Sequence, residues 1–337
     1  MSRKYTEYSI LDLAIVSQGV SLKETFDHSL ALAQAADEAG YSRYWLAEHH
    51  NSEAIGSSAT SILIGKIAEG TKRIRIGSGG IMLPNHSPLI IAEQFGTLGI
   101  LYPNRIDLGL GRAPGTDQLT ANAIRSDFYQ ASQSFPTEVQ KIQDYFSTDN
   151  ATEKVRATVA EGVEVPLYIL GSSTDSAHLA AKKGLPYAFA SHFATTHLSN
   201  ALAIYHNEFQ PSPVLEKPYT LAGINVIVAD TDEEAERMST SLYKMIIGLL
   251  TGKRGFMQPP SDMTVELREM SQYPSVQQML KYSFIGSKKT VKQQIKSFMD
   301  ATQVDELIAV TNIYDGADRI QSYRLFAEIM KELNGEG

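Results

Sequence analysis

Two adjacent histidines follow an apolar run early in the chain. Residues 44–47 form a short strand-like segment, and Glu48, His49 and His50 come directly after it. Neighbouring strand residues point to opposite faces, so the two imidazoles are not expected to bind one metal ion together. An imidazole has an ordinary pKa of about 6.5 and could exchange a proton near neutral pH. Whichever of the two faces the barrel mouth could serve as a catalytic base, although a histidine in such a place is more often structural.

Glycines stand at the end of the next strand-like segment. Residues 76–84 read Ile-Gly-Ser-Gly-Gly-Ile-Met-Leu-Pro, with Gly79 and Gly80 in the middle. Bare backbone allows a flat ring to lie close against the protein. Together with the histidines, this segment predicts a pocket for a planar cofactor with a titratable group beside it.

Small hydroxyl residues open a predicted helix in the middle of the chain. Gly171, Ser172, Ser173 and Ser176 follow an apolar strand-like segment. The free N–H groups of a helix start attract anions, and serine hydroxyls add hydrogen bonds, so this loop suits a phosphate group. Arg112 follows another strand-like segment and could bind the same phosphate through its planar guanidinium. Many serines begin helices without binding a ligand, which is the alternative interpretation.

Strand-like and helix-like segments alternate along the whole chain. This alternation is typical of parallel strands covered by helices. In a barrel of this kind, catalytic groups gather at the carboxyl ends of the strands. We therefore expect an α/β fold, a (β/α)8 TIM barrel in which residues 1–337 form a single domain. The eight predicted strands are residues 9–13, 44–47, 74–77, 106–110, 167–170, 187–189, 222–228 and 306–309.

Two insertions, after the fourth and seventh strands, are too long to be simple connections. Residues 112–166 include an amphipathic helix predicted around 139–146. Residues 229–286 contain one clear helix and then a weakly periodic tract at 251–274. Long loops of barrels commonly lie over the active site. The tract at 251–274 is either a mobile lid or a flexible surface insertion.

The composition excludes several classes of function. A formal net charge of −8 without a long basic run argues against binding to nucleic acid or to an anionic membrane. The apolar stretches are shorter than a bilayer span, and the first residues are polar rather than a signal sequence. The absence of cysteine excludes thiol catalysis and thiolate metal sites. We expect a cytoplasmic protein without a metal site.

Four blocks of sequence carry a family resemblance when they are taken in order. They are residues 47–50, 77–88, 105–112 and 171–176. On these residues the chain resembles the bacterial luciferase-like flavin monooxygenases, and the resemblance extends over nearly the whole chain. One block alone is weakly specific, whereas the four together are highly specific.

The resemblance implies an enzyme that uses reduced FMN and molecular oxygen to oxygenate a small organic substrate. A separate flavin reductase would supply the reduced FMN. His49 matches the family's active-site histidine, near the flavin position at which oxygen adds. Gly79 and Gly80 match a pair joined by a cis peptide bond under the isoalloxazine ring. The positions that hold the FMN phosphate are matched by Arg112, Gly171, Ser172, Ser173 and Ser176.

The resemblance also implies a quaternary structure and a lid. Relatives are commonly homodimers, so the helices near residues 60–68 and 89–98 are the candidate interface. The tract at 251–274 matches a lid that shields the bound flavin from water.

Some positions depart from the light-emitting members of the family. Those members have a cysteine where Gly111 stands and a glutamate where Gly171 stands, which argues against bioluminescence more than against flavin binding. Their second phosphate-binding arginine has no match here, although Arg125 lies nearby.

Three alternatives stay open. One is hydride transfer with the deazaflavin F420, although an acidic chain offers its polyanionic tail little attraction. Another is a non-catalytic FMN-binding flavoprotein, in which His49 and a lid would have no use. A sugar-phosphate barrel enzyme would account for Ser172 and Arg112 but not for Gly79 and Gly80.

Overall fold

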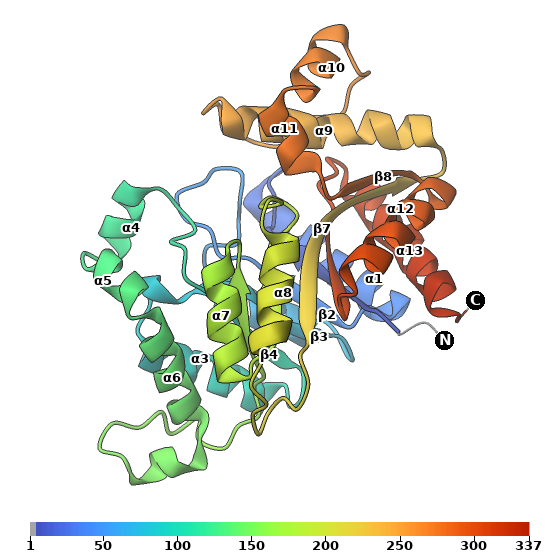
Figure 1. The fold of residues 1–337 in the computed structure, drawn as a ribbon. Helices are drawn as coiled ribbons and strands as arrows, with labels where there is room; N and C mark the ends of the chain where they lie inside the picture. Colours follow the sequence, from blue (N-terminus) through green and yellow to red (C-terminus); the bar gives the residue numbers. More distant parts are fainter. Residues whose placement is uncertain (1–4, 337) are drawn as a thin grey trace.

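Eight parallel strands pair edge to edge until the sheet closes on itself. The computed structural model describes residues 5–336; residues 1–4 and 337, which the expected single domain includes, lie outside the described residues. The strands follow one another in chain order, and the last one pairs with both the first and the seventh. Helices surround the barrel (Figure 1), which confirms the predicted TIM barrel and all eight predicted strands. They are β1 (Glu7–Asp12), β2 (Arg43–Leu46), β3 (Arg75–Met82), β4 (Ile106–Gly111), β5 (Leu167–Gly171), β6 (Tyr187–Phe189), β7 (Thr220–Ala229) and β9 (Glu306–Val310).

A further strand, β8 (Ser283–Ser287), pairs only with β7 and was not predicted. The second half of β7, from Asn225 to Ala229, pairs with β8, while its first half pairs with β9. Phe284 is the one buried apolar side chain of β8. β8 has few apolar residues and contains Gly286, so it does not stand out in the sequence. Strand prediction depends on longer runs of apolar or alternating residues.

The helices begin and end close to their sequence signals. Ser21 forms a complete capping box at the start of α1, and Gly40 ends this helix with φ of 87°. Thr231 accepts a hydrogen bond from the backbone N–H of Glu234 at the start of another helix, but the Glu234 side chain pairs with Arg237, so no complete capping box forms there. None of the helices within residues 5–336 combines the length and the apolar character needed to cross a membrane. The helices outside the insertions are α1 (Leu22–Ala39), α2 (Thr60–Glu69), η1 (Leu83–Asn85), α3 (Pro88–Leu101), α7 (Thr174–Lys183), α8 (Leu198–Glu208), α12 (Lys288–Thr302) and α13 (Gly316–Asn334).

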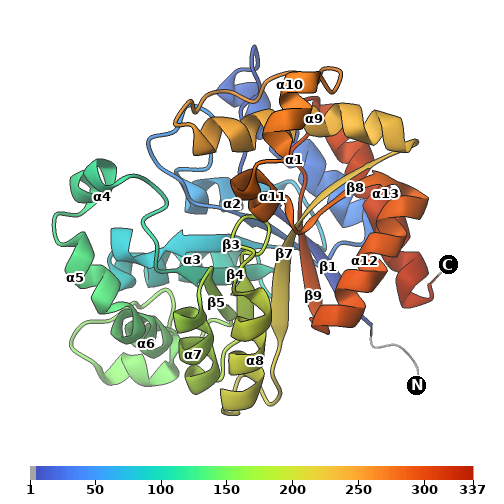
Figure 2. The same ribbon diagram turned by 45° about the horizontal axis from the view of Figure 1, so that its top comes forward.

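Both long connections contain more helix than their sequences predict. Between β4 and β5 lie α4 (Gln118–Ile124), α5 (Phe128–Gln133), α6 (Phe135–Phe146) and η2 (Thr148–Thr152). The amphipathic helix predicted at 139–146 is α6, which begins earlier because Pro136 stands in its first turn. Between β7 and β8 lie α9 (Asp232–Leu250), α10 (Val265–Ser271) and α11 (Pro274–Leu280). These three helices lie beyond the carboxyl end of the barrel (Figures 1 and 2).

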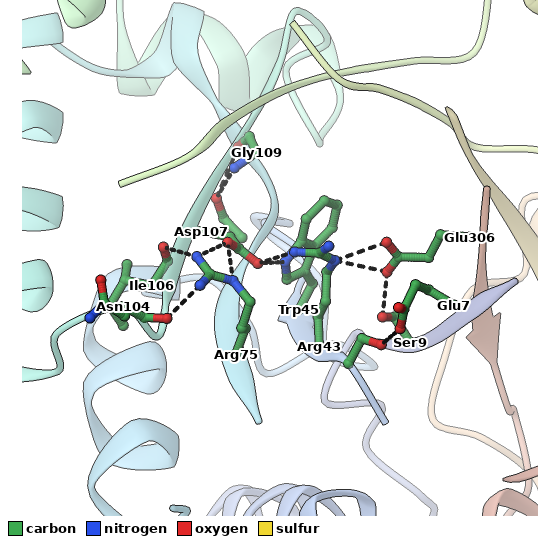
Figure 3. Close-up of polar contacts among 12 residues, drawn as sticks. Glu7, Ser9, Arg43, Trp45, Arg75, Asn104, Ile106, Asp107, Gly109 and Glu306 are labelled. Carbon is green, nitrogen blue, oxygen red and sulfur yellow. Dashed lines mark hydrogen bonds and ion pairs between the residues drawn. The ribbon is translucent and has the colours of Figure 1, made fainter. Parts of the chain in front are cut away.

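The amino-terminal end of the barrel is closed by buried ion pairs. Arg43, the first residue of β2, lies 3.1 Å from Asp107 Oδ2 and 2.8 Å from Glu306 Oε1. Asp107 also pairs with Arg75 at 2.6 Å and accepts a hydrogen bond from Trp45 Nε1 at 3.1 Å. These side chains belong to β2, β3, β4 and β9, and Figure 3 shows how they point toward one another. The charges of Arg43 and Arg75 balance those of Asp107 and Glu306, so this network has no net charge. It lies at the end of the barrel opposite the predicted site.

Candidate active site

The predicted site residues lie at one end of the barrel. His49 follows β2, Gly79 and Gly80 lie in the second half of β3, and Arg112 follows β4. The loop from Gly171 onward follows β5. Since these strands are parallel neighbours in the sheet, their carboxyl ends meet at the same rim.

The imidazole of His49 is held by the backbone of another loop. Its Nδ1 lies 3.1 Å from the carbonyl oxygen of Gly115, and the backbone N–H of His50 donates to the same oxygen at 3.2 Å. A carbonyl oxygen can only accept, so Nδ1 carries the proton and the lone pair of neutral His49 is on Nε2. Burial lowers the pKa of His49, and the positive charge of Arg254 lowers it further. The geometry therefore presents a neutral imidazole with a free acceptor nitrogen.

Glu48 binds neighbouring groups rather than His49. Its buried carboxylate accepts hydrogen bonds from His50 Nε2 at 2.8 Å, His86 Nε2 at 2.9 Å, Asn85 Nδ2 at 3.1 Å and the backbone N–H of Met82 at 3.0 Å. Burial alone would raise the pKa of Glu48, but these hydrogen bonds outweigh it and lower the pKa to about 2. Over the residues that the structure describes, no group of three histidine or acidic side chains is arranged to hold a metal ion.

Gly79 and Gly80 are joined by a cis peptide bond, as the resemblance implies. A Cβ atom on Gly79 would lie 2.8 Å from Leu11 Cδ1, and one on Gly80 would lie 2.7 Å from the carbonyl oxygen of Gly109. Both positions therefore exclude a side chain because of the surrounding chain itself. The bare backbone that the sequence attributes to a flat ligand is also required by packing, of Gly79 against Leu11 and Trp45 and of Gly80 against β4.

The start of α7 offers backbone N–H donors that have no partner among residues 5–336. Ser173 is its N-cap residue, yet its side chain makes no capping hydrogen bond. Ser176 Oγ donates to the Ser173 carbonyl at 3.0 Å and lies 3.1 Å from the Tyr187 hydroxyl. Any Cβ on Gly171 would lie 1.7 Å from Ser176 Oγ, so Ser176 keeps its present position only with glycine at 171. We call residues 171–176 the anion loop, because its free N–H groups and hydroxyls fit a phosphate.

Arg112 lies beside the anion loop. Its Nη2 is 3.0 Å from Asp175 Oδ2, and both side chains are exposed. An exposed ion pair is weak and can exchange partners, so Arg112 is able to bind a phosphate placed at the loop. The other nearby arginine, Arg125, is engaged elsewhere: it pairs with Asp127 at 2.7 Å and donates to the His86 carbonyl at 3.0 Å.

His192 lies at the same rim after β6. Its Nδ1 is buried, and no residue in the described part of the chain hydrogen-bonds to it. Burial lowers its pKa to about 4, with a smaller contribution from His49. The ring occupies the space beside Gly223, where a Cβ would lie 2.4 Å from Nδ1. His197, by contrast, is exposed at the start of α8.

Two residues of the rim have no clear sequence signal. Gly115 lies within the insertion after β4, with φ of 64°, and a Cβ there would lie 2.6 Å from the carbonyl oxygen of Glu48. The contact joins residues that are distant in sequence, so spacing cannot reveal it. Arg254 lies in the insertion after β7, and only its effect on His49 distinguishes it from other surface cations.

Comparisons with known proteins agree with the fold and with the sequence blocks. The sequence profile of the luciferase-like monooxygenase family matches residues 6–305. A luciferase-like monooxygenase of Escherichia coli (strain K12) is 45% identical over 335 residues, which cover 99% of this chain and 100% of that protein. The N-acetyl-S-alkylcysteine monooxygenase of Bacillus subtilis (strain 168) is 30% identical, covering 95% of this chain and 97% of the relative.

Solved structures share the architecture. The crystal structure of apo-MsnO8 superposes with a TM-score of 0.89 at 33% identity, covering 97% of this chain and 99% of that one. Two more distant structures show the same fold: the oxygenating constituent of 3,6-diketocamphane monooxygenase from Pseudomonas putida, in complex with FMN (TM-score 0.72, 17% identity), and an F420-dependent secondary alcohol dehydrogenase (TM-score 0.72, 15% identity). Since the family profile and the relatives span almost the full length, the chain belongs to the luciferase-like monooxygenase family.

Proposed function

We propose that the protein is an FMN-dependent monooxygenase that uses reduced FMN and molecular oxygen to oxygenate a small organic substrate. The observation that carries the proposal is His49: its Nδ1 is fixed by the Gly115 carbonyl at 3.1 Å, and its free Nε2 belongs to the rim that also carries the anion loop. A catalytic base and a phosphate site on one rim suit a phosphate-bearing planar cofactor.

The anion loop and Arg112 would hold the FMN phosphate. The free N–H groups at the start of α7 would bind phosphate oxygens, assisted by the hydroxyls of Ser172, Ser173 and Ser176. Gly171 keeps the loop close to its own helix, and Arg112 would leave Asp175 for the phosphate. The backbone of Gly79 and Gly80 would support the ring system. When it is bound, reduced flavin supplies the activation of oxygen, which no side chain can supply.

His49 would hold or move a proton at Nε2. Its lowered pKa keeps the ring neutral at neutral pH, so Nε2 can accept a proton from a group beside it. Because the Gly115 carbonyl fixes the tautomer, the ring does not need to rotate before it accepts this proton. The residue is then a proton-handling group and not a nucleophile.

The insertion at 251–274 would exclude water from the site. Met257 donates its N–H to the Val16 carbonyl at 3.0 Å and accepts from the Gln18 N–H at 2.9 Å. The insertion is thereby attached to the loop after β1, and it would cover the rim between β7 and β1. Exclusion of water protects reactive flavin species from breaking down before the substrate reacts.

FMN is favoured over F420 by the relatives and by charge. The N-acetyl-S-alkylcysteine relative is a monooxygenase, and the structural neighbour from Pseudomonas putida binds FMN. The F420-dependent neighbour is less similar in sequence than the relatives named as monooxygenases. With a net charge of −8, the chain suits the compact phosphate of FMN better than a polyanionic tail.

A homodimer would form through α2 and α3. Ile62 of α2 is 72% exposed, and Ile90 and Ile100 of α3 are 46% and 56% exposed. Leu101, at the end of α3, is 61% exposed. Neighbouring isoleucines that are exposed on two helices of a single chain are typical of a surface that another protein chain covers. A second copy of the chain would bury them, as the resemblance to the family implies. A separate reductase would deliver reduced FMN.

The test mixes the protein anaerobically with reduced FMN and then admits oxygen, while flavin absorbance and oxygen uptake are followed. We expect flavin reoxidation to be slower than that of free flavin and to change in His49→Gln. His197→Gln, at an exposed histidine, serves as the matched control and should behave as wild type. Reoxidation indistinguishable from free flavin would contradict the proposal. FMN binding without any oxygen chemistry would favour a non-catalytic flavoprotein, and binding of F420 alone would favour hydride transfer.

A further inference from the structure

The insertion after β7 carries a cation without a counter-ion. Arg254 lies on the connection between α9 and α10, and its side chain is exposed. Its guanidinium makes no ion pair and no hydrogen bond with any residue from 5 to 336. Other arginines at this end of the barrel are paired: Arg112 with Asp175, and Arg125 with Asp127. An unpaired guanidinium beside a site is available to a ligand.

Arg254 is held near the rim by the backbone that follows it. Three residues later, Met257 pairs with the loop after β1 through two hydrogen bonds, at 3.0 Å to Val16 and 2.9 Å from Gln18. The loop that carries His49 follows β2, the neighbour of β1 in the barrel. The Met257 hydrogen bonds therefore hold the Arg254 segment on the side of the site, and the small effect of Arg254 on the pKa of His49 agrees with this position.

The FMN phosphate would lie on the opposite side of the rim. Round the closed sheet, β5 is four strands away from β1 in either direction. The anion loop follows β5, whereas the Arg254 segment is attached beside β1. One phosphate cannot contact both the anion loop and Arg254, so Arg254 is available to bind a different anionic group.

Exposed apolar side chains accompany the cation. Leu249 and Leu250 end α9 and are 42% and 44% exposed, and Phe256, two residues after Arg254, is 41% exposed. Phe193, in the loop after β6, is 50% exposed. A single cation among apolar groups suits a ligand with one charged end and an apolar body.

We infer that Arg254 binds the carboxylate of an otherwise apolar substrate, on the side of the barrel mouth opposite the anion loop. This inference rests on the proposed function, because it assigns the substrate end of the same site. The planar guanidinium fits a carboxylate with two parallel hydrogen bonds, which a neutral substrate would not use. Arg254 would thus place the substrate body between itself and His49.

The test measures binding of simple carboxylates by calorimetry, in the presence of oxidised FMN. The probes are octanoate and 3-phenylpropanoate, each compared with its primary amide. We expect wild type to bind each acid about tenfold or more tightly than its amide, since a charge-assisted hydrogen bond contributes that much. Arg254→Gln should lose this preference, and Arg254→Lys should keep part of it. Arg268→Gln, which removes a cation paired with Glu236 on the same insertion, should leave all affinities unchanged.

Several outcomes would overturn the inference. Equal binding of acids and amides to wild type would do so, as would no binding of either series or an equal effect of Arg268→Gln. A loss of FMN affinity in Arg254→Gln as large as in Arg112→Gln would assign Arg254 to the phosphate instead. Wild-type protein that binds no FMN would contradict the proposed function, whereas FMN binding without a preference for acids would contradict only the role of Arg254.

Discussion

The Nδ1 atom of His49 and the carbonyl oxygen of Gly115 lie 3.1 Å apart, although they belong to loops after different strands. The same oxygen accepts the N–H of His50, so one carbonyl fixes both the loop and the ring. Two residues separate Gly115 from Arg112, which lies beside the anion loop. The loop that would contact the phosphate therefore also orients the imidazole.

Replacing Gly115 should impair His49 without removing any side chain of the site. Gly115→Ala would strain a backbone with φ of 64° and place a Cβ 2.6 Å from the Glu48 carbonyl oxygen. We expect flavin-dependent turnover to fall more than tenfold. The matched control is Gly19→Ala, where φ is 85° and no atom lies within 4 Å of the new Cβ. Equal turnover in the two variants, measured as oxygen uptake with reduced FMN, would show that the Gly115 carbonyl does not position His49.

Removing the Glu48 carboxylate should make folding stability less dependent on pH. The pKa of Glu48 is about 2 in the folded protein and 4.5 ordinarily, so its ionised form contributes about 3 kcal/mol of stability at neutral pH. Because the folded pKa is the lower one, this contribution is complete above pH 4.5 and is lost as the pH falls toward 2. Glu48→Gln should therefore differ most from wild type at pH 7.

Urea unfolding at several pH values measures this effect. The stability difference between wild type and Glu48→Gln should shrink steadily below pH 4.5. Glu164→Gln, at an exposed glutamate that makes no ion pair or hydrogen bond with residues 5–336, is the control and should show little difference at pH 7. A difference that stays constant from pH 7 to pH 3 would mean that Glu48 is not ionised in the folded protein.

Arg112 should discriminate between flavins with and without a phosphate. Arg112→Gln is expected to weaken FMN binding about tenfold, since a charge-assisted bond to phosphate contributes about 1.5–3 kcal/mol. Riboflavin lacks the phosphate, so its affinity should not change. Fluorescence quenching of each flavin measures both affinities. A parallel loss for FMN and riboflavin would place Arg112 under the ring or in the fold rather than at the phosphate.

The barrel was predictable because each of its strands is a run of apolar residues that ends in polar or glycine residues. His49 and the anion loop were recognisable for the same reason, since they stand at the ends of β2 and β5, and Gly80 was recognisable because glycines interrupt the apolar run of β3. β8 was missed because only Phe284 of its side chains is buried. Strand ends can therefore be located from local patterns, whereas a strand that only extends the sheet cannot.

The partners of the site residues were not predictable. Glu48 precedes His49 in the sequence, yet it binds His50 and His86, because the direction of a side chain in a loop depends on the neighbouring loops. Gly115 contributes to the site through its carbonyl oxygen, and Arg254 is distinctive because it has no counter-ion among residues 5–336. Neither property can be predicted from the local sequence. Such contacts arise only when the strand ends are brought together.

The ion pairs at the other end of the barrel should affect stability but not the site. Arg43→Gln would leave the buried carboxylates of Asp107 and Glu306 without their shared partner, a change that typically costs about 3–5 kcal/mol. Lys217→Gln, in an exposed connection, is the control and should be neutral. Urea unfolding should show the loss for Arg43→Gln, while FMN affinity under folding conditions stays at the wild-type value, because the network lies at the amino ends of the strands. A loss of FMN affinity without a loss of stability would contradict this separation of the two ends.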